Sequence, residues 1–294
     1  MTVTQTSADE YFGLAKEFFS KAPGLAYPDL ERYFWYHTID LGNGLITPGC
    51  YDYRPSLPAF GFPNDMQGMK ALDVGSATGF FAFEFEKRGA SVTSIEIPSL
   101  RDWDCFPGET SQQLIEKTKI ELGKGGWRPG QESPENLFAN STPQELYRYT
   151  LDGPFRFCHD QLHSKVVRHY APIYDLSEAT LGKEKFDLVF AGDVLWHTIN
   201  PLQALAAIAA VCSGTLIIAQ DLQEQVSPHP VMLYIGGDKS GEDSAAWWVP
   251  NGPWFEQVLK KLGFKDVAVV GKHSGVMRPA GVPYDRSIIH AKRA

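Results

Sequence analysis

The sequence predicts a doubly wound α/β fold whose central sheet has seven strands, most of them parallel. The first observation is the stretch 69–97, where an apolar run, a glycine turn, a helix-like segment and a β-branched run follow one another. The second is that further apolar runs alternate with helical segments, and the third is a closing β-rich pair expected to be antiparallel. These later strands are predicted at 166–176, 185–191, 214–220, 265–270 and 286–291.

The glycine turn at 75–79 predicts a ligand site. Gly75 permits a sharp turn after the buried strand 71–74, and Gly79 lets a ligand approach without meeting a Cβ. Glu96, at the tip of the next strand, is placed to accept hydrogen bonds from both hydroxyl groups of a ribose. We therefore expect a nucleotide site here, with a plain strand-to-helix connection as the alternative.

Length and charge narrow the class of protein. A chain of 294 residues can form one large α/β domain with additions, or two small domains. The net charge of −8 disfavours nucleic acid as a partner, because non-specific affinity for phosphate backbones comes from clustered Lys and Arg.

Cysteine usage and hydropathy point to the cytoplasm. The four cysteines are scattered without a C-x-x-C pair, so free thiols are expected in place of disulfides or a metal framework. The N-terminus lacks a basic region followed by an apolar core, and no apolar run reaches transmembrane length. We expect a cytoplasmic protein that does not engage a membrane.

The N-terminal part, 1–65, is expected to form a helix and a cap segment ahead of a main domain at 66–294. Residues 11–19 have helical periodicity, and Ser7 or Asp9 is the expected N-cap. This helix packs either on the main domain or on a partner subunit, and the second alternative would make the protein a homodimer.

Residues 27–65 are rich in aromatic residues, prolines and glycines. The segment 41–45 predicts a tight hairpin, because Asn-Gly tolerates positive φ at both central positions. The whole stretch either covers the edge of the sheet or caps the mouth of the ligand site. In the second case Tyr36 and His37 face a substrate.

A segment at about 99–154 is too long and too often broken by proline and glycine to be one crossover helix. It predicts an insertion of short helices, at 110–122 and 142–149, above the carboxyl edge of the sheet. A regular crossover helix is expected at 155–165. His159 and His163 stand one turn apart on it, and we expect helix surface there and no metal site.

The polar, glycine-rich stretch 226–253 predicts a long loop with aromatic residues. Loops of this length in a compact domain usually have a function. Its aromatic residues either line an apolar substrate pocket or pack against an oligomer partner. These residues are Tyr234, Trp247 and Trp248, with Trp254 opening the last helix, at 254–262.

Two motifs carry a resemblance to class I S-adenosylmethionine (SAM) methyltransferases, which have a Rossmann-like fold. The glycine turn resembles their motif D-x-G-x-G-x-G with alanine at the middle glycine, whereas its spacing differs from the G-x-G-x-x-G of NAD-binding proteins. The stretch 35–49 resembles the W-x-H-x-I-[DE]-L-G-[DN]-G-x-x-T-P-G signature found in relatives of the tRNA wobble-uridine 5-oxyacetate methyltransferases. The stretch 193–201 resembles their motif IV and V-L-[YW]-H-x-x-[DNS]-P element.

The resemblance implies SAM as cofactor and assigns the site residues. An acid after the third strand takes the adenine amino group in such enzymes, and Asp175 with Leu176 match that position. Asp175 as a simple helix cap is the alternative. The implied cofactor-binding residues are Asp73, Gly75, Ser76, Ala77, Gly79, Glu96, Ile97, Asp175, Leu176, Asp193 and Val194, and the expected substrate residues are Tyr36, Trp196, Tyr234, Trp247 and Trp248.

The sequence departs from the wobble-uridine enzymes at two places. Trp196 replaces their usual tyrosine, and Ser56–Phe62 lacks the cations of the segment that recognises a carboxylated cofactor. We therefore expect plain SAM as donor and a small-molecule acceptor. A tRNA-modifying enzyme and a non-catalytic SAM-binding module remain alternatives, and an NAD oxidoreductase ranks last.

Methyl transfer from a sulfonium is a direct displacement, so the protein mainly supplies in-line proximity and a dry site. A hydroxyl, thiol or protonated amine acceptor must also lose a proton, which suits a histidine. We expect His197 to be this base, with His37 as second candidate, and a purely structural role as the alternative for each.

Overall fold

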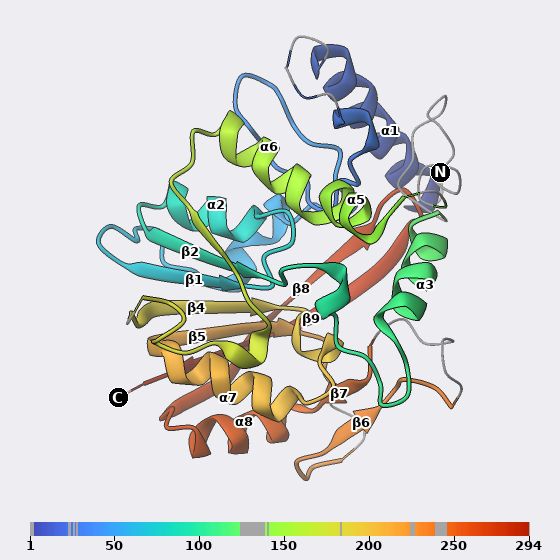
Figure 1. The fold of residues 1–294 in the computed structure, drawn as a ribbon. Coiled ribbons are helices and arrows are strands. Elements are labelled where there is room, and N and C mark those ends of the chain that lie inside the picture. Colours follow the sequence, from blue (N-terminus) through green and yellow to red (C-terminus); the bar gives the residue numbers. More distant parts are fainter. Residues whose placement is uncertain are drawn as a thin grey trace.

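The computed structural model describes residues 3–22, 25, 27, 29–123, 139, 141–182, 184–223, 227–238 and 246–293. Its centre is a seven-stranded sheet in the order β3-β2-β1-β4-β5-β9-β8 (Figure 1). Strands β3, β2, β1, β4 and β5 run parallel, and β9 and β8 join antiparallel. The predicted fold class is confirmed. The strands are β1 (Lys70–Val74), β2 (Ser91–Glu96), β3 (Val167–Tyr170), β4 (Phe186–Gly192), β5 (Cys212–Gln220), β8 (Asp266–Met277) and β9 (Val282–Lys292).

Helices cover both faces of the sheet. Helices α2 (Phe80–Lys87) and α6 (Gly153–Gln161) pack on one face, and α7 (Pro201–Val211) and α8 (Gly252–Lys261) on the other (Figure 1). An apolar core lies on each face of the sheet. The side chains of β1 point alternately into the two cores, because successive residues of a strand point to opposite faces. The inner parallel strands β2, β1, β4 and β5 are therefore largely buried on both sides, whereas β3, at the edge of the sheet, is partly exposed.

Helix α1 (Val3–Lys21) packs on the same core as α6. The Phe18 ring lies 5.0 Å from that of Trp35 and 5.9 Å from that of Phe157. The expected cap at Ser7 or Asp9 is wrong, because the helix already runs through both positions and a cap residue needs non-helical backbone. The boundary between residues 65 and 66 stays a prediction.

The predicted hairpin at 41–45 is confirmed. Leu41 N donates to Leu45 O at 2.8 Å, and Asn43 and Gly44 both have positive φ, 52° and 70°. After the hairpin the chain returns to Gly49, which lies against the backbone of His37. This return holds His37 in place beside the glycine turn.

Gly49 leaves no room for a side chain. A Cβ there would lie 1.9 Å from the carbonyl carbon of His37 and 2.2 Å from the backbone nitrogen of Thr38. We expect Gly49→Ala to reduce the free energy of unfolding by at least the ~1–3 kcal/mol typical of overpacking, since backbone atoms cannot step aside. Urea denaturation followed by circular dichroism measures the loss.

The control for this change is Gly13→Ala on α1, where nothing lies within 4 Å of the added Cβ. Alanine there should be neutral or stabilising by about 0.5–1 kcal/mol, because glycine in a helix carries an entropic cost. A Gly49→Ala protein as stable as the Gly13→Ala protein would contradict the packing described.

The insertion contains α3 (Ser111–Gly123) and α5 (Pro143–Tyr147), close to the predicted positions. Thr142 and Glu145 form a capping box that starts α5, and a π-helical turn, Arg148–Asp152, joins it to α6.

The crossover helix α6 ends at Gln161, four residues before its predicted end. His163 lies beyond the helix with φ 52°, so it is not one turn from His159 on a common helix face. Among the described residues no group of three or more His, Cys, Asp or Glu is arranged to hold a metal ion.

The long loop at 226–253 is only partly described, and it contains the strand pair β6 (Met232–Tyr234) and β7 (Trp248–Pro250), which the sequence did not predict. The closing strands are also longer than predicted. Their extension carries Met277 to the carboxyl edge of the sheet. Within the described ranges, no helix has the length and hydropathy needed to cross a membrane.

Candidate active site

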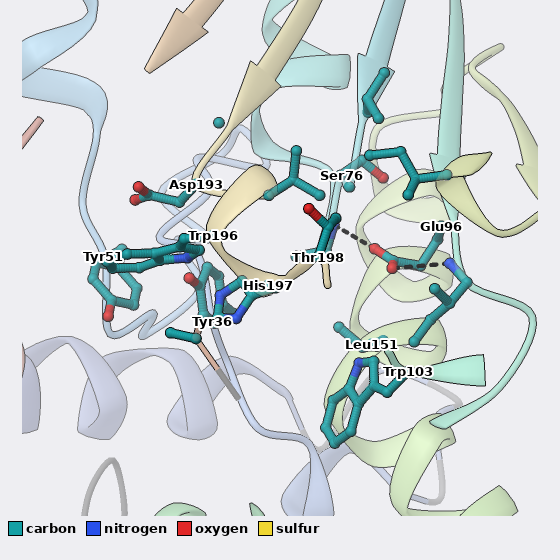
Figure 2. A pocket seen from close by; sticks show the side chains of 18 of the residues that line it. Tyr36, Tyr51, Ser76, Glu96, Trp103, Leu151, Asp193, Trp196, His197 and Thr198 are labelled. Atoms are coloured by element: carbon teal, nitrogen blue, oxygen red, sulfur yellow. Dashed lines mark hydrogen bonds between the residues drawn. The ribbon is translucent and has the colours of Figure 1, made fainter. Parts of the chain in front are cut away.

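A cavity of about 760 Å³ lies at the carboxyl ends of β1, β2 and β4. This volume falls in the range of ~300–1,000 Å³ common for small-molecule pockets. Figure 2 shows two groups of side chains in it. At one end, which we call the Glu96 end, Ser76, Trp103 and Leu151 lie near Glu96. The other end, which we call the Asp193 end, contains Tyr36, Tyr51, Asp193, Trp196 and His197.

Glu96 is held at the glycine turn by backbone N–H groups. Its Oε2 accepts from Ala77 N at 2.8 Å and its Oε1 accepts from Ile97 N at 3.0 Å. Arg168 of β3 supports the arrangement, since its Nη1 donates to Ala77 O at 2.9 Å and its Nη2 lies 3.5 Å from Glu96 Oε2. Glu96 is 8% exposed, and these contacts fix the direction of its carboxylate before any ligand arrives.

The two glycines of the turn have different roles. Gly75 has φ 70° and lines the cavity, and a Cβ there would lie 2.8 Å from Val194 Cγ2. Gly79 has φ 92°, but it does not line the cavity. A Cβ on it would lie 2.7 Å from the rings of Phe83 and Phe155, so this glycine makes room for helix packing and not for a ligand.

Asp73 is buried beneath the turn and accepts one hydrogen bond from Ala82 N at 3.1 Å. Burial, with a smaller contribution from the nearby Glu96 carboxylate, raises the pKa of Asp73 to about 7. A carboxyl group in this position is protonated more readily in the folded protein than in the unfolded chain.

This raised pKa predicts a pH-dependent stability. Because the folded pKa of Asp73 lies above the ordinary value of 3.8, its contribution is fully present below about pH 4 and is lost as the pH rises through 7. Asp73→Asn removes that loss, so the melting temperature of the variant relative to wild type should rise between pH 5 and pH 8. Each unit of pKa shift corresponds to about 1.4 kcal/mol.

Thermal unfolding of both proteins across this pH range tests the prediction, with Asp65→Asn at an exposed position as the control for the change in net charge. A melting difference between Asp73→Asn and wild type that does not vary with pH would contradict it.

The Asp193 end is built around a partly buried ion pair that the sequence did not reveal. Both carboxylate oxygens of Asp193 accept from Arg286 Nε, at 2.5 and 2.6 Å. The Arg286 guanidinium also lies over the Trp196 ring, 4.7 Å from its centroid. Burial raises the pKa of Asp193 to about 6, and the Arg286 charge opposes that rise.

Three histidines border the cavity, and they differ in exposure. His37 is 5% exposed among aromatic rings, and burial lowers its pKa to about 3. His273 of β8, which was not predicted as a site residue, is also buried, and burial lowers its pKa to about 4. His197 ends a short 3₁₀ helix, Leu195–His197, and is exposed. Of the three, His197 is the one that solvent reaches.

Most of the residues predicted for the site do line this cavity. They come from the N-terminal segment, β1, the glycine turn, the end of β2, the segment after β4, and the residue before β7. The set is Tyr36, His37, Asp73, Gly75, Ser76, Ala77, Glu96, Ile97, Asp193, Val194, Trp196, His197 and Trp247.

Asp175 and Leu176 do not line the cavity, contrary to expectation. Strand β3 stops at Tyr170, because Pro172 cannot donate to a strand ladder, and a 3₁₀ turn follows. Asp175 is exposed at the end of that turn, and Leu176 is buried in the core under α7. Ile173 and Tyr174 face the cavity in their place.

Tyr234 and Trp248 also lie outside the cavity. Tyr234 is 44% exposed, and its ring contacts that of Trp248 at 5.2 Å. The indole N–H of Trp248 donates to Ile199 O at 3.0 Å, so the ring is held at the surface of the loop after β4. Trp247 points the other way and is fully buried against the cavity.

The insertion covers the Glu96 end. Trp103 and Asp104 line the cavity there, and Asp104 Oδ2 accepts from Ile199 N at 2.8 Å and from the hydroxyl of Tyr174. Tyr147 of α5 donates to Ile97 O at 2.7 Å. The insertion thereby joins the loops after β2, β3 and β4 over one part of the cavity.

The chain matches a family model described as "Methyltransferase domain" over residues 51–269. It is 29% identical over 104 residues to the tRNA U34 carboxymethyltransferase of Pseudomonas putida, a match covering 33% of this chain and 30% of that protein. The chain thus aligns with less than a third of the length of this relative, which belongs to the group that the signature at 35–49 resembles.

Two solved structures are similar at 14% identity. One is magnesium protoporphyrin IX methyltransferase from Synechocystis PCC 6803 with bound SAM, with a TM-score of 0.39 over 78% of this chain and 72% of that chain. The other is the 1,6-didemethyltoxoflavin-N1-methyltransferase of Burkholderia thailandensis, with a TM-score of 0.44 over 97% and 90%. Neither identifies the acceptor of this chain.

With a family match over 219 of its residues, the chain belongs to the methyltransferase-domain family. Its sheet order, its glycine turn and the acid at the end of β2 place it in the class I, SAM-dependent group of that family.

Proposed function

We propose that the protein transfers the methyl group of SAM to an oxygen, nitrogen or sulfur atom of a small molecule. The observation that carries the proposal is one cavity with two differently built ends. The Glu96 end offers a fixed carboxylate beside a glycine turn, and the Asp193 end offers aromatic side chains. A donor in the first and an acceptor in the second would meet in the middle.

In this proposal Glu96 binds the ribose hydroxyl groups of the donor. Asp73, Gly75, Ser76, Ala77, Ile97 and Val194 surround the rest of SAM. Trp103 and Leu151 lie near Glu96 and are suited to hold the adenine between apolar surfaces (Figure 2). Asp175 and Leu176 have no part in it, since neither reaches the cavity.

Plain SAM is the proposed donor, not a carboxylated derivative. A carboxylate on the donor needs a cation at the reacting end. Arg286 is already paired with Asp193, and Arg278, which lines the cavity, donates to Gly49 O and to the hydroxyl of Thr38. The segment 54–60 is a 3₁₀ helix that brings Phe60 to the cavity, not a cation.

The reaction is a direct displacement, in which the acceptor atom bonds to the methyl carbon as the bond from carbon to sulfur breaks. When the acceptor atom carries a proton, His197 takes it, because its imidazole borders the cavity and reaches solvent. His37 is less suited, since a histidine with a pKa of about 3 is a weak base at neutral pH.

A tRNA-modifying activity is the second candidate, supported by the curated relative. The net charge of −8 argues against a tRNA substrate.

A cytoplasmic location and a homodimer also stay predictions. The four cysteines are unpaired, which suits a reducing compartment.

Methyl-labelled SAM separates the two candidates. The purified protein is incubated with it and with either the low-molecular-weight fraction or the total tRNA of a cell extract. We expect label in the small-molecule fraction only. Label in tRNA alone would favour the second candidate, and label in neither fraction would contradict the proposal.

A further inference from the structure

We propose that Arg278 binds a carboxylate group of the acceptor at the Asp193 end of the cavity. This inference rests on the proposed function and adds the charge of the acceptor and the residue that recognises it. It is carried by a buried guanidinium that lines the cavity and has hydrogen-bond donors left over.

Arg278 follows strand β8 and lies at the Asp193 end. Its backbone N donates to Cys50 O at 2.9 Å, and Sδ of the preceding Met277 accepts from the Tyr51 hydroxyl at 3.3 Å. All four of these residues line the cavity. Arg278 is 7% exposed, so its charge is largely removed from water.

The guanidinium of Arg278 has no carboxylate of its own. Among the described residues, the carboxylate nearest to it belongs to Asp52, which Arg54 already binds. Asp52 Oδ1 accepts from Arg54 Nε at 2.8 Å, and its Oδ2 accepts from Arg54 Nη2 at 2.7 Å. Arg278 Nη1 lies 3.7 Å from Asp52 Oδ2, which is too long for a hydrogen bond.

The same guanidinium keeps unused donors. An arginine side chain has five N–H groups. Nη2 of Arg278 donates to Gly49 O at 2.8 Å and to the hydroxyl of Thr38, whereas no hydrogen bond from Nη1 or Nε reaches a described residue. A buried donor without a partner costs free energy, and a ligand carboxylate would remove that cost through charge-assisted hydrogen bonds.

Two indole N–H groups that border the cavity are also unpaired. Nε1 of Trp196 and Nε1 of Trp247 are buried and have no partner among the residues that the structure describes. Indole and guanidinium groups donate hydrogen bonds and do not accept them. The phenols of Tyr36 and Tyr51 keep their protons, because burial raises their pKa, and so do not repel an anion. These unused donors suit a ligand that brings acceptor oxygens.

Arg286 is not free for the same role. Its Nε donates to both carboxylate oxygens of Asp193, and its guanidinium lies over the Trp196 ring. A carboxylate that bound there would have to displace Asp193. Arg278 is therefore the arginine left for a ligand at this end.

We assign the carboxylate to the acceptor because of where Arg278 is anchored. Its partners Thr38 and Gly49 belong to the N-terminal segment, and Thr38 N donates to Tyr51 O at 2.8 Å. This segment forms part of the Asp193 end, where the acceptor is placed. A SAM derivative with a carboxylate on its methyl group would bring the same chemistry from the donor side, so the experiment includes it.

Binding of paired naphthalene probes to the protein saturated with the demethylated product of SAM tests the inference. The probes are 2-naphthoate and the uncharged 2-naphthamide, which have nearly the same shape, measured by calorimetry at neutral pH. We expect 2-naphthoate to bind at least about tenfold more tightly to wild type, and Arg278→Gln to abolish this preference. Equal affinities in wild type, no binding of 2-naphthoate, or a preference that a folded Arg278→Gln protein retains would overturn the inference.

A second variant changes the site without replacing Arg278. Arg54→Gln releases Asp52 to pair with Arg278, so it should lower the affinity for 2-naphthoate about tenfold. Arg156→Gln is the matched control, because it removes the same charge from an exposed side chain of α6 outside the cavity and should keep the preference. If Arg278→Gln does not fold, Arg54→Gln decides, and an unchanged preference in it would overturn the inference.

The source of the carboxylate is tested by titrating SAM and its carboxylated derivative into wild type and Arg278→Gln. We expect the ratio of the two affinities to be the same in both proteins. A preference for the carboxylated derivative that depends on Arg278 would overturn the assignment to the acceptor.

The same titrations distinguish this inference from the proposed function. If the demethylated product of SAM does not bind, the proposed function fails. If it binds and 2-naphthoate shows no preference that depends on Arg278, only the carboxylate site is wrong.

Discussion

Replacing Glu96 by alanine should weaken the binding of SAM and of its demethylated product by about 1–3 kcal/mol, the cost of losing hydrogen bonds to a charged group. Glu96 is expected to carry the largest single share of cofactor affinity, because Ala77 N and Ile97 N aim its carboxylate into the cavity. Calorimetric titration measures the change, and each tenfold loss of affinity corresponds to about 1.4 kcal/mol.

Glu84→Ala is the matched control. Glu84 lies on α2, pairs with Arg88 at 2.9 Å and does not line the cavity, so its loss should leave cofactor affinity unchanged. Glu96→Gln retains one oxygen acceptor and should fall between the alanine variant and wild type. Wild-type affinity in the Glu96→Ala protein would remove this residue from the cofactor site.

Replacing His197 by alanine should lower turnover by about 10²–10⁴-fold, the typical contribution of a general base, and leave the affinity for SAM nearly intact. The imidazole lies at the Asp193 end, away from Glu96 (Figure 2). Single-turnover kinetics with the acceptor found by label transfer measures the rate, and calorimetry measures the affinity.

His37→Gln provides the comparison, because this side chain borders the same cavity and is buried. We expect it to reduce turnover less than His197→Ala does. Normal turnover in His197→Ala, or a larger loss in His37→Gln, would exclude His197 as the base.

The parts of the fold that local patterns encode were predictable. The strand, turn, helix and strand of 70–96 lie where the apolar runs and glycines place them. The outer ends of β8 and β9 were not predictable from local patterns. His273, Ser274 and Gly275 of β8 have no strand-like pattern, and pairing with β9 orders them. Strand β3 was predicted too long, since Ile173 and Tyr174 are apolar but belong to a 3₁₀ turn.

The same distinction holds for the site. Glu96 and the glycine turn could be predicted because they lie within one supersecondary unit. Arg286 could not be predicted, since it lies 93 positions from Asp193 in the sequence. Only the register in which β9 pairs with β5 brings the two side chains together. Arg168 gave one usable signal, a charge inside a predicted apolar strand, but its partner, Glu96, follows only from the pairing of β3 with β2.

The most direct test of the central claim is a calorimetric titration of SAM, its demethylated product and NAD into the purified, ligand-stripped protein. We predict that SAM or its demethylated product binds near a micromolar dissociation constant, about 8 kcal/mol, and that NAD gives no heat of binding. Binding of NAD with neither SAM nor its product bound would contradict the assignment of the Glu96 end, and the roles proposed for Asp193, Trp196 and His197 would fail with it.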